Sequence, residues 1–255
     1  MHVEERFGLR GRVALVTGAS RGLGAAMARA VADAGADVVL HSSHEPARAT
    51  AEAIAAAAAA RTACVMADLA DPAAPERILQ QAIEAFGRVD ILVNNAGIIR
   101  RAAAVDYSDE DWDTVINVNL TSLFRLCRAA GRGMLKRGSG KIINIASLLS
   151  FQGGIRVPAY AAAKGAVAQL TRALANEWAE GGVCVNAIAP GYFRTDNTQA
   201  LIDDPERYAA ITARIPARRW GNPSDLGGAV VFLASPASDY VHGHVLVVDG
   251  GWMAR

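Results

Sequence analysis

Short apolar runs alternate with longer amphipathic stretches along almost the whole chain. The runs have the length of buried strands, and the stretches between them carry apolar residues at helical spacing. This pattern predicts strands at 13–17, 37–40, 63–67, 91–94, 141–145, 183–188 and 245–248, and helices at 22–34, 47–61, 73–86, 109–136 (in two pieces), 159–180 and 224–233.

The alternation of strands and helices predicts an α/β fold. We expect one Rossmann-type, doubly wound parallel sheet with helices on both faces, in a single domain over residues 1–255. Ser108, followed by Asp111, has the spacing of a capping box and predicts a helix start. The segment 191–220 breaks the alternation. A long excursion beside the ligand-binding edge of such a sheet favours a substrate lid.

Composition and charge exclude several classes of function. The 255 residues are 52% hydrophobic with a net charge of +1, which argues against a nucleic-acid or anionic-membrane partner. No apolar stretch approaches the ~20 residues that span a bilayer. Cys64, Cys127 and Cys184 lie in apolar segments without a C-x-x-C pair, which predicts buried free thiols in a reducing cytoplasm.

Residues 17–24 (TGASRGLG) form a glycine-rich turn between a predicted strand and a predicted helix. Gly18 would permit the tight turn, Gly22 would let the backbone approach phosphates, and Gly24 would let the helix pack closely on the strand. The free N–H groups at the helix start would then meet a dinucleotide pyrophosphate. A glycine-rich turn without a ligand is the alternative, because the spacing differs from the commoner G-x-G-x-x-G.

A second motif predicts proton transfer. Tyr160 and Lys164 are four residues apart, so they share one helix face. A nearby cation favours the phenolate and lowers the pKa of a tyrosine, which would let Tyr160 exchange a proton with a carbonyl or an alcohol. Ser147 follows the strand at 141–145, at the expected ligand edge, where its hydroxyl could hold the substrate oxygen. Taken singly, each of these residues also has an ordinary structural explanation.

Together these motifs resemble the short-chain dehydrogenase/reductase family over essentially the whole chain. The positions that match are residues 17–24, Asp68, Leu69, residues 94–97, Asn119, Ser147, Tyr160, Lys164, Pro190, Gly191 and Thr195.

The resemblance implies an NAD(P)-dependent oxidoreductase that acts on CH–OH groups. It implies Tyr160 as general acid/base, Lys164 as modulator of its pKa and ligand of the nicotinamide ribose, and Ser147 as anchor of the substrate oxygen. Asn119 would hold a water that relays the proton from Lys164. The resemblance also implies Asp68 at the adenine, residues 95–97 beside the adenine ribose, and Pro190, Gly191 and Thr195 against the nicotinamide. Asn94 would be structural. A cofactor-binding sensor without chemistry is the rival from another class, and the presence of all four catalytic residues argues against it.

The choice of cofactor depends on the end of the second strand. Enzymes specific for NAD usually carry an acid there, but this chain has Ser42 and Ser43. With Arg21 they could accept a 2′-phosphate, which favours NADP, although NAD stays open. The predicted cofactor-binding residues are Gly18, Ser20, Arg21, Gly22, Leu23, Gly24, Ser42, Ser43, Asp68, Leu69, Asn95, Ala96, Gly97, Tyr160, Lys164, Pro190, Gly191, Phe193 and Thr195.

Several segments resemble one subgroup of the family, the 2-dehydro-3-deoxy-D-gluconate 5-dehydrogenases (2-deoxy-D-gluconate 3-dehydrogenases). The segments are 94–101, 151–160, 176–178, 186–198, 214–225 and 248–255. The resemblance implies a sugar-acid substrate. Gluconate 5-dehydrogenase and 3-oxoacyl thioester reductase are alternatives within the family.

A sugar acid carries a carboxylate that must be paired when the site closes, and arginines near the ligand edge could pair with it. Arg100 and Arg101 follow the fourth strand, and Gln152 could bond a sugar hydroxyl. The predicted substrate residues are Ser147, Gln152, Arg156, Tyr160, Arg100 and Arg194.

The remaining expectations concern histidines and assembly. His242 and His244 lack further metal ligands nearby and predict surface or interface positions, so no metal is expected. His41 and His44 are expected in a loop near the adenosine. The resemblance implies a homotetramer that uses the last strand and the helix before it.

Overall fold

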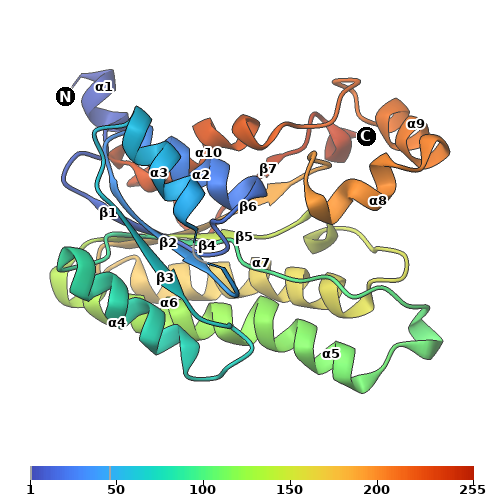
Figure 1. Cartoon of the computed structure of the whole chain (residues 1–255), viewed down its shortest axis with the longest axis horizontal. Coiled ribbons are helices and arrows are strands. Elements are labelled where there is room, and N and C mark those ends of the chain that lie inside the picture. Colours follow the sequence, from blue (N-terminus) through green and yellow to red (C-terminus); the bar gives the residue numbers. More distant parts are fainter. Residues whose placement is uncertain (1, 46) are drawn as a thin grey trace.

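A parallel sheet runs through the middle of the computed structural model, which describes residues 2–45 and 47–255 (Figure 1). Within those residues the sheet has seven strands: β1 (Val13–Val16), β2 (Asp37–Ser42), β3 (Thr62–Met66), β4 (Ile91–Asn94), β5 (Gly140–Ile145), β6 (Val183–Pro190) and β7 (Val245–Val248). Their order is β3-β2-β1-β4-β5-β6-β7, with every neighbouring pair parallel. This confirms the predicted Rossmann-type doubly wound sheet.

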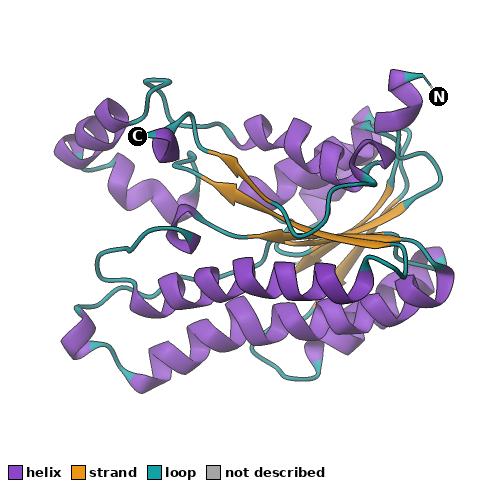
Figure 2. Cartoon of the chain, turned by 180° about the vertical axis from the view of Figure 1, so that it is seen from behind, coloured by secondary structure: helices purple, strands orange, loops and turns teal. Residues whose placement is uncertain are grey.

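Helices cover both faces of the sheet (Figures 1 and 2). One face packs against α2 (Gly22–Asp33), α3 (Arg48–Ala57) and α10 (Gly227–Ala234). The opposite layer contains α4 (Ala74–Phe86), α5 (Asp109–Ile116), α6 (Ser122–Arg137) and α7 (Pro158–Trp178). Each face has its own apolar core, so the central strands are buried on both sides. That burial explains why they appear in the sequence as continuous apolar runs.

The cysteines show where the apolar pattern is an incomplete guide. Cys127 and Cys184 are buried free thiols, as predicted. Cys64 is exposed, so its predicted burial is wrong. The reason is its place on β3, the edge strand, where Val65 points into the core and Cys64 and Met66 point outward.

The helical stretch predicted in two pieces at 109–136 is interrupted by one π-helical turn. Ser108 caps α5 by accepting the Asp111 N–H at 3.1 Å, as its capping-box spacing predicts. The turn at Asn117–Thr121 joins α5 to α6. Such π-turns inside helices frequently occur at functional sites, and this one holds the buried side chain of Asn119.

The segment after β6 forms a small subassembly of its own. It contains α8 (Gln199–Ile202) and α9 (Pro205–Arg214), and the C-terminus lies beside α9 (Figure 1). A third apolar cluster holds it to the rest of the molecule and includes Trp220 and Trp252. A helical excursion at 191–220, next to the carboxyl end of β6, is the arrangement that the lid hypothesis requires.

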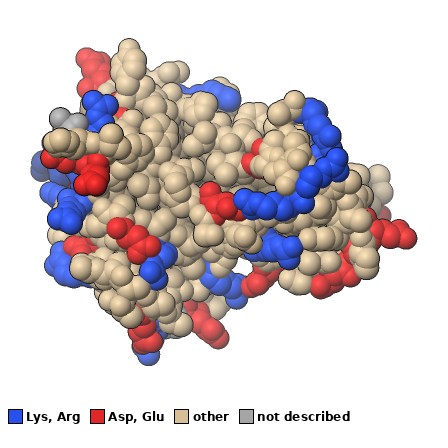
Figure 3. Space-filling model, turned by 90° about the horizontal axis from the view of Figure 1, so that it is seen from above, with Lys and Arg blue, Asp and Glu red and all other residues tan. Residues whose placement is uncertain are grey.

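Surface charge is mixed. On the face seen in Figure 3, basic and acidic side chains are interspersed instead of forming one field of a single sign. In the part of the chain that the structure describes, no helix is both long and apolar enough to cross a membrane.

Candidate active site

The glycine-rich turn meets the end of β4 at the point where the strand order reverses. The Thr17 hydroxyl accepts the backbone N–H groups of Asn95 and Ala96, each at 3.0 Å. The Asn95 amide donates to the carbonyls of Thr17 (2.9 Å) and Gly18 (3.1 Å). The predicted contact of residues 95–97 with a cofactor ribose therefore falls mainly to their backbone, because the Asn95 side chain holds the turn in place.

The turn has the shape of a phosphate cradle. Gly18 has φ +62°, and a Cβ on Gly24 would lie 2.1 Å from the Gly18 carbonyl oxygen. Only glycine permits this approach of the helix to the turn. No side chain caps the start of α2, so the first N–H groups of this 12-residue helix are available to an anion. These features fit a dinucleotide pyrophosphate.

The serines at the end of β2 are not equivalent. The Ser42 hydroxyl is buried and donates to the Glu45 carbonyl, so its only O–H group is occupied. Ser43 is half-buried. The predicted phosphate contact is therefore more compatible with Ser43 than with Ser42.

Other predicted adenosine-end residues have local partners as well. Asp68 accepts the Ala70 N–H at 2.9 Å. The Leu69 side chain belongs to the apolar core, which leaves its backbone for any cofactor contact.

Arg21 extends toward the segment after β6. Its Nε lies 2.9 Å from a carboxylate oxygen of Asp196. Both side chains are exposed, so the pair is weak and a phosphate could compete for Arg21.

The residues predicted to contact the nicotinamide lie at the end of β6 and in the segment that follows it. Pro190 is the last residue of β6, and the Gly191 N–H donates to the Val248 carbonyl at 2.9 Å. The Phe193 side chain is buried in the core, so only its backbone is available to a cofactor. Thr195 lies beside Gly22, because a Cβ on that glycine would lie 3.8 Å from the Thr195 methyl group.

The proposed catalytic side chains converge at the carboxyl ends of β5 and β6. Tyr160 and Lys164 come from the first turns of α7, and the Lys164 ammonium lies 5.6 Å from the centroid of the tyrosine ring. That ammonium donates to the Ile145 carbonyl at 2.6 Å. Ser147 caps the short helix that follows β5, where its hydroxyl accepts the Leu149 N–H at 3.2 Å.

Burial dominates the electrostatics of this cluster. Burial raises the pKa of Tyr160, and the hydrogen bond with Ser147 and the charge of Arg101 oppose the rise. Lys164 is not among the groups that shift this pKa, because its ammonium binds the Ile145 carbonyl and faces the ring instead of the phenol oxygen. Its role as modulator of the tyrosine pKa stays a prediction. Burial lowers the pKa of Lys164 to about 8.

Asn119 reaches the cluster from the π-turn. Its Oδ1 accepts the Ile98 N–H and its amide donates to the Ile98 carbonyl, both at 2.8 Å. A Cβ on Gly97 would lie 3.0 Å from Asn119 Oδ1 and 3.9 Å from Lys164 Nζ, so these groups lie around the same small space.

Asn94, expected to be structural, bonds the Asn144 side chain at 2.9 Å and the thiol of Cys127 at 3.2 Å.

Three of the predicted substrate residues already have partners. Arg100 pairs with Asp111 at 3.4 Å, and Arg194 donates to the Tyr208 hydroxyl at 2.7 Å. Gln152 accepts the indole N–H of Trp252 at 3.3 Å. A substrate would have to compete with these contacts, although the exposed pair of Arg100 and Asp111 is weak.

The adjacent Arg101 is the arginine whose charge acts on Tyr160, and it also donates to the Asn197 carbonyl at 3.2 Å. Its position after the fourth strand makes it, like Arg100, a candidate partner of the substrate carboxylate, although only Arg100 enters the final set of predicted substrate residues. The sequence spacing does not distinguish Arg100 from Arg101. The path of the loop does, because it directs Arg100 to Asp111 and Arg101 to the Asn197 carbonyl. Arg156 is exposed, with φ +64°, in the loop that leads to α7.

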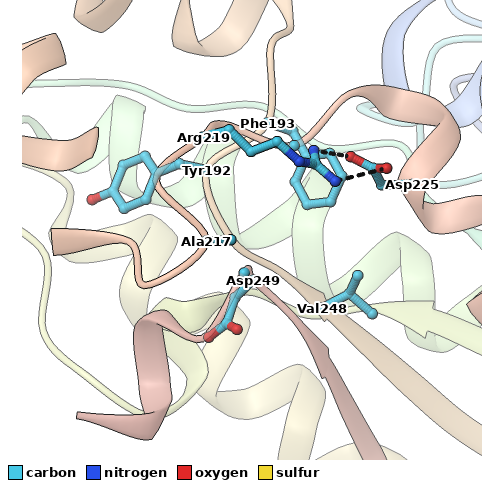
Figure 4. A pocket seen from close by; sticks show the side chains of 9 residues that line it. Tyr192, Phe193, Ala217, Arg219, Asp225, Val248 and Asp249 are labelled. Atoms are coloured by element: carbon cyan, nitrogen blue, oxygen red, sulfur yellow. Dashed lines mark hydrogen bonds and ion pairs between the residues drawn. The ribbon is translucent and has the colours of Figure 1, made fainter. Parts of the chain in front are cut away.

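A cavity of about 280 Å³ lies beside the segment that follows β6 (Figure 4). Its wall includes the ion pair between Arg219 and Asp225. Ser147, Tyr160 and Lys164 do not line it, so this cavity does not contain the proposed catalytic cluster. The lining residues are Tyr192, Phe193, Ala217, Arg219, Gly221, Asp225, Val248, Asp249 and Gly250.

Comparisons with known proteins agree with this geometry. A family model described as enoyl-(acyl carrier protein) reductase matches residues 18–253. The chain belongs to the short-chain dehydrogenase/reductase family. It is an oxidoreductase of that family by the same match.

Individual relatives are similar over their whole length. The chain is 53% identical to 2-dehydro-3-deoxy-D-gluconate 5-dehydrogenase of Bacillus subtilis, covering 100% of this chain and 99% of that protein. It is 52% identical to the enzyme of the same name from Escherichia coli, covering 98% of each. A crystal structure from Agrobacterium tumefaciens, provisionally assigned as a 2-deoxy-D-gluconate 3-dehydrogenase with bound NADP, has a TM-score of 0.92 at 53% identity and covers 98% of this chain and 99% of that one.

His41 lies inside β2 and is fully buried, so its predicted loop position is wrong. The described residues contain no group of three or more His, Cys, Asp or Glu side chains arranged to hold a metal ion.

Proposed function

We propose that this chain is an NADP-dependent 2-dehydro-3-deoxy-D-gluconate 5-dehydrogenase. The observation that carries the proposal is the meeting of Tyr160 and Lys164, on the first turns of α7, with the end of β5. The Lys164 ammonium lies 5.6 Å from the centroid of the tyrosine ring and donates to the Ile145 carbonyl, two residues before Ser147. Ser147 can hold the substrate oxygen, and Tyr160 can exchange the proton of that oxygen. The relatives of that name, at more than 50% identity over full length, support the choice of substrate.

Tyr160 exchanges the proton in this proposal. In the oxidation direction the phenolate accepts the hydroxyl proton of the substrate, while the hydrogen on the same carbon leaves as hydride. The bound nicotinamide supplies the acceptor of that hydride. Ser147 donates its hydroxyl proton to the substrate oxygen and holds the reacting carbon in place. In the reduction direction the phenol returns the proton to the carbonyl oxygen.

Lys164 and Asn119 support the proton transfer. With its pKa lowered to about 8, Lys164 can exchange a proton near neutral pH more readily than an ordinary lysine. Asn119 lies beside the same space as the lysine ammonium. Each atom of its amide makes one hydrogen bond with Ile98 and retains capacity for another, which suits a site for a relaying water.

The residues at the end of β2, together with Arg21, favour NADP over NAD. β2 ends in serines without an acid, and Ser43 and Arg21 are the available groups for a 2′-phosphate. The relative from Agrobacterium tumefaciens binds NADP. Arg21 would exchange Asp196 for the phosphate when the cofactor enters.

The substrate carboxylate pairs with Arg101 in this proposal. Arg101 is the arginine whose charge reaches the catalytic phenol, whereas Arg100 and Arg194 are held by other side chains. Its bond to the Asn197 carbonyl links it to the start of the segment 191–220, which we propose as the lid.

Absorbance at the reduced-nicotinamide band tests the function. We expect rapid reduction of NADP in the presence of 2-dehydro-3-deoxy-D-gluconate, slower reduction of NAD, and loss of several orders of magnitude in Tyr160→Phe with cofactor binding retained. Reduction with gluconate or oxidation of the reduced cofactor by a 3-oxoacyl thioester, without activity on the deoxy sugar acid, would replace this proposal by one of those two alternatives.

We also propose a single domain over residues 1–255 and a homotetramer that uses β7 and α10. β7 is an edge strand with partly exposed apolar residues, and α10 carries partly exposed apolar residues as well. Size-exclusion chromatography with light scattering tests the assembly, and a monomer mass would contradict it.

A further inference from the structure

His41 occupies an unusual place under the phosphate turn. The last paired residues of β1 and β2 are Val16 and Leu40, so His41 lies one residue beyond that ladder. It still pairs with β3, opposite Val65. The imidazole is fully buried between the glycine-rich turn on one side and the end of β3 on the other.

Two successive N–H groups of the turn bond to this one residue. The Gly18 N–H points at His41 Nδ1 at 3.4 Å, and the Ala19 N–H bonds the His41 carbonyl at 2.8 Å. On the far side, His41 Nε2 lies 2.9 Å from the carbonyl oxygen of Ala67, the residue before Asp68. A single side chain thus connects the proposed pyrophosphate site to the proposed adenine site.

The partners determine the protonation state of the ring. Nδ1 faces an N–H donor and must accept, and Nε2 faces a carbonyl and must donate, which together describe the neutral Nε2–H tautomer. Burial lowers the pKa of His41, and the Ala67 carbonyl and the Asp68 carboxylate oppose the shift. An uncharged ring with both nitrogens occupied offers nothing to a 2′-phosphate.

We propose that His41 is a positioning residue that holds the glycine-rich turn in its dinucleotide-binding conformation, through the bond that its Nδ1 accepts from Gly18. This inference rests on the proposed function, because it requires a dinucleotide at the turn. Without that acceptor the partly buried Gly18 N–H is unpaired, and the left-handed residue at the head of the turn is held only through its carbonyl, by the Asn95 amide. The turn must then be ordered when the cofactor binds, which weakens binding.

Three substitutions separate the contacts of the ring. His41→Asn retains an acceptor near the position of Nδ1, His41→Gln can retain only the bond toward Ala67, and His41→Leu retains neither. We expect dissociation constants for NADPH, measured by fluorescence titration, to rise on the order of tenfold in the Gln and Leu variants and only about twofold in the Asn variant. The dissociation constant for NADH should rise by the same factor as that for NADPH. The kcat at saturating cofactor should change little.

Ser43→Ala is the matched comparison, because it is expected to weaken the binding of NADPH and to leave the binding of NADH unaffected. A loss in the His41 variants that is selective for NADPH would overturn the positioning role and make the ring a phosphate contact. Equal losses in the Asn, Gln and Leu variants would assign the effect to packing and overturn the role of the Gly18 bond. Failure of the unmodified protein to bind either dinucleotide would instead overturn the proposed function, and this inference with it.

The unmodified protein provides a test that does not depend on how the variants fold. The chain has five histidines, so ¹⁵N NMR of histidine-labelled protein resolves their tautomers, with His41→Asn used to assign the signal. We expect the His41 signal to show protonated Nε2 and unprotonated Nδ1 at pH 7, with and without NADPH. A protonated Nδ1 would exclude the proposed bond.

Discussion

The guanidinium of Arg21 lies 2.9 Å from the carboxylate of Asp196, and this ion pair joins the glycine-rich turn to the first residues of the segment after β6. In the proposed function the 2′-phosphate of NADP competes with Asp196 for the same guanidinium. The pair is exposed, so competition requires little energy.

Removing this competitor should strengthen cofactor binding selectively. We expect Asp196→Asn to lower the dissociation constant of NADPH by about two- to fivefold and to leave that of NADH unchanged, because exposed ion pairs contribute about 0.2–1 kcal/mol. Arg21→Ala should weaken the binding of NADPH and leave the binding of NADH unchanged. Fluorescence titration at low and high salt measures both effects. Equal shifts for the two cofactors would show that Arg21 does not meet the phosphate.

Arg101 should determine affinity for the acid substrate. Arg101→Gln is expected to raise KM for 2-dehydro-3-deoxy-D-gluconate by about tenfold or more, because charged hydrogen bonds contribute about 1.5–3 kcal/mol. A neutral analogue should be affected much less. Arg100→Gln is the matched control, since its partner is Asp111. Arg156→Ala, compared in the same way, tests the exposed arginine in the loop that leads to α7. A larger effect from Arg100 than from Arg101 would contradict the assignment.

Lys164 should reduce the stability of the folded protein at neutral pH. Its pKa falls from 10.5 to about 8 on folding, so between those values the unfolded chain binds more protons and stability rises with pH. Keeping the buried ammonium charged at pH 7 costs about 3 kcal/mol. Lys164→Met should therefore be inactive but more stable at pH 7, with Tm higher by several degrees.

The pH dependence supplies the control for that prediction. The stability difference between Lys164→Met and the unmodified chain should shrink from pH 8 to pH 10, because only the unmodified chain gains stability across that window. Thermal unfolding without cofactor measures it. A variant less stable at both pH values would mean that the Ile145 bond outweighs the cost of burial.

Gly24 should tolerate no side chain. A Cβ there would lie 2.1 Å from the Gly18 carbonyl oxygen and 2.5 Å from the Asn95 amide, so Gly24→Ala must displace α2 from the turn. We expect dinucleotide binding to fall at least a hundredfold. Gly228→Ala in α10 is the comparison, because a Cβ there meets nothing within 4 Å. Normal binding by Gly24→Ala would contradict the cradle geometry.

Much of the fold could be predicted because its signals are local. Continuous apolar runs identify strands buried on both faces, and β4 and β7 occupy the predicted residues. The cap at Ser108 follows from its own spacing. The predicted ends of helices and strands were wrong where burial changes along an element. The helix predicted to residue 61 ends at Ala57, and β2 continues past residue 40 to His41 and Ser42.

The sequence by itself determined which chemistry the chain could carry. The spacing of Tyr160 and Lys164, the serine after β5 and the glycine turn are one-dimensional patterns, and the sheet topology makes them meet at one edge. Only the tertiary structure decided how these groups act on each other. Burial set the pKa directions of Tyr160 and Lys164, and the path of one loop gave Arg100 and Arg101 different partners, Asp111 and the Asn197 carbonyl. Hydrogen-bond partners and desolvation depend on residues distant in the sequence, so local spacing does not contain them.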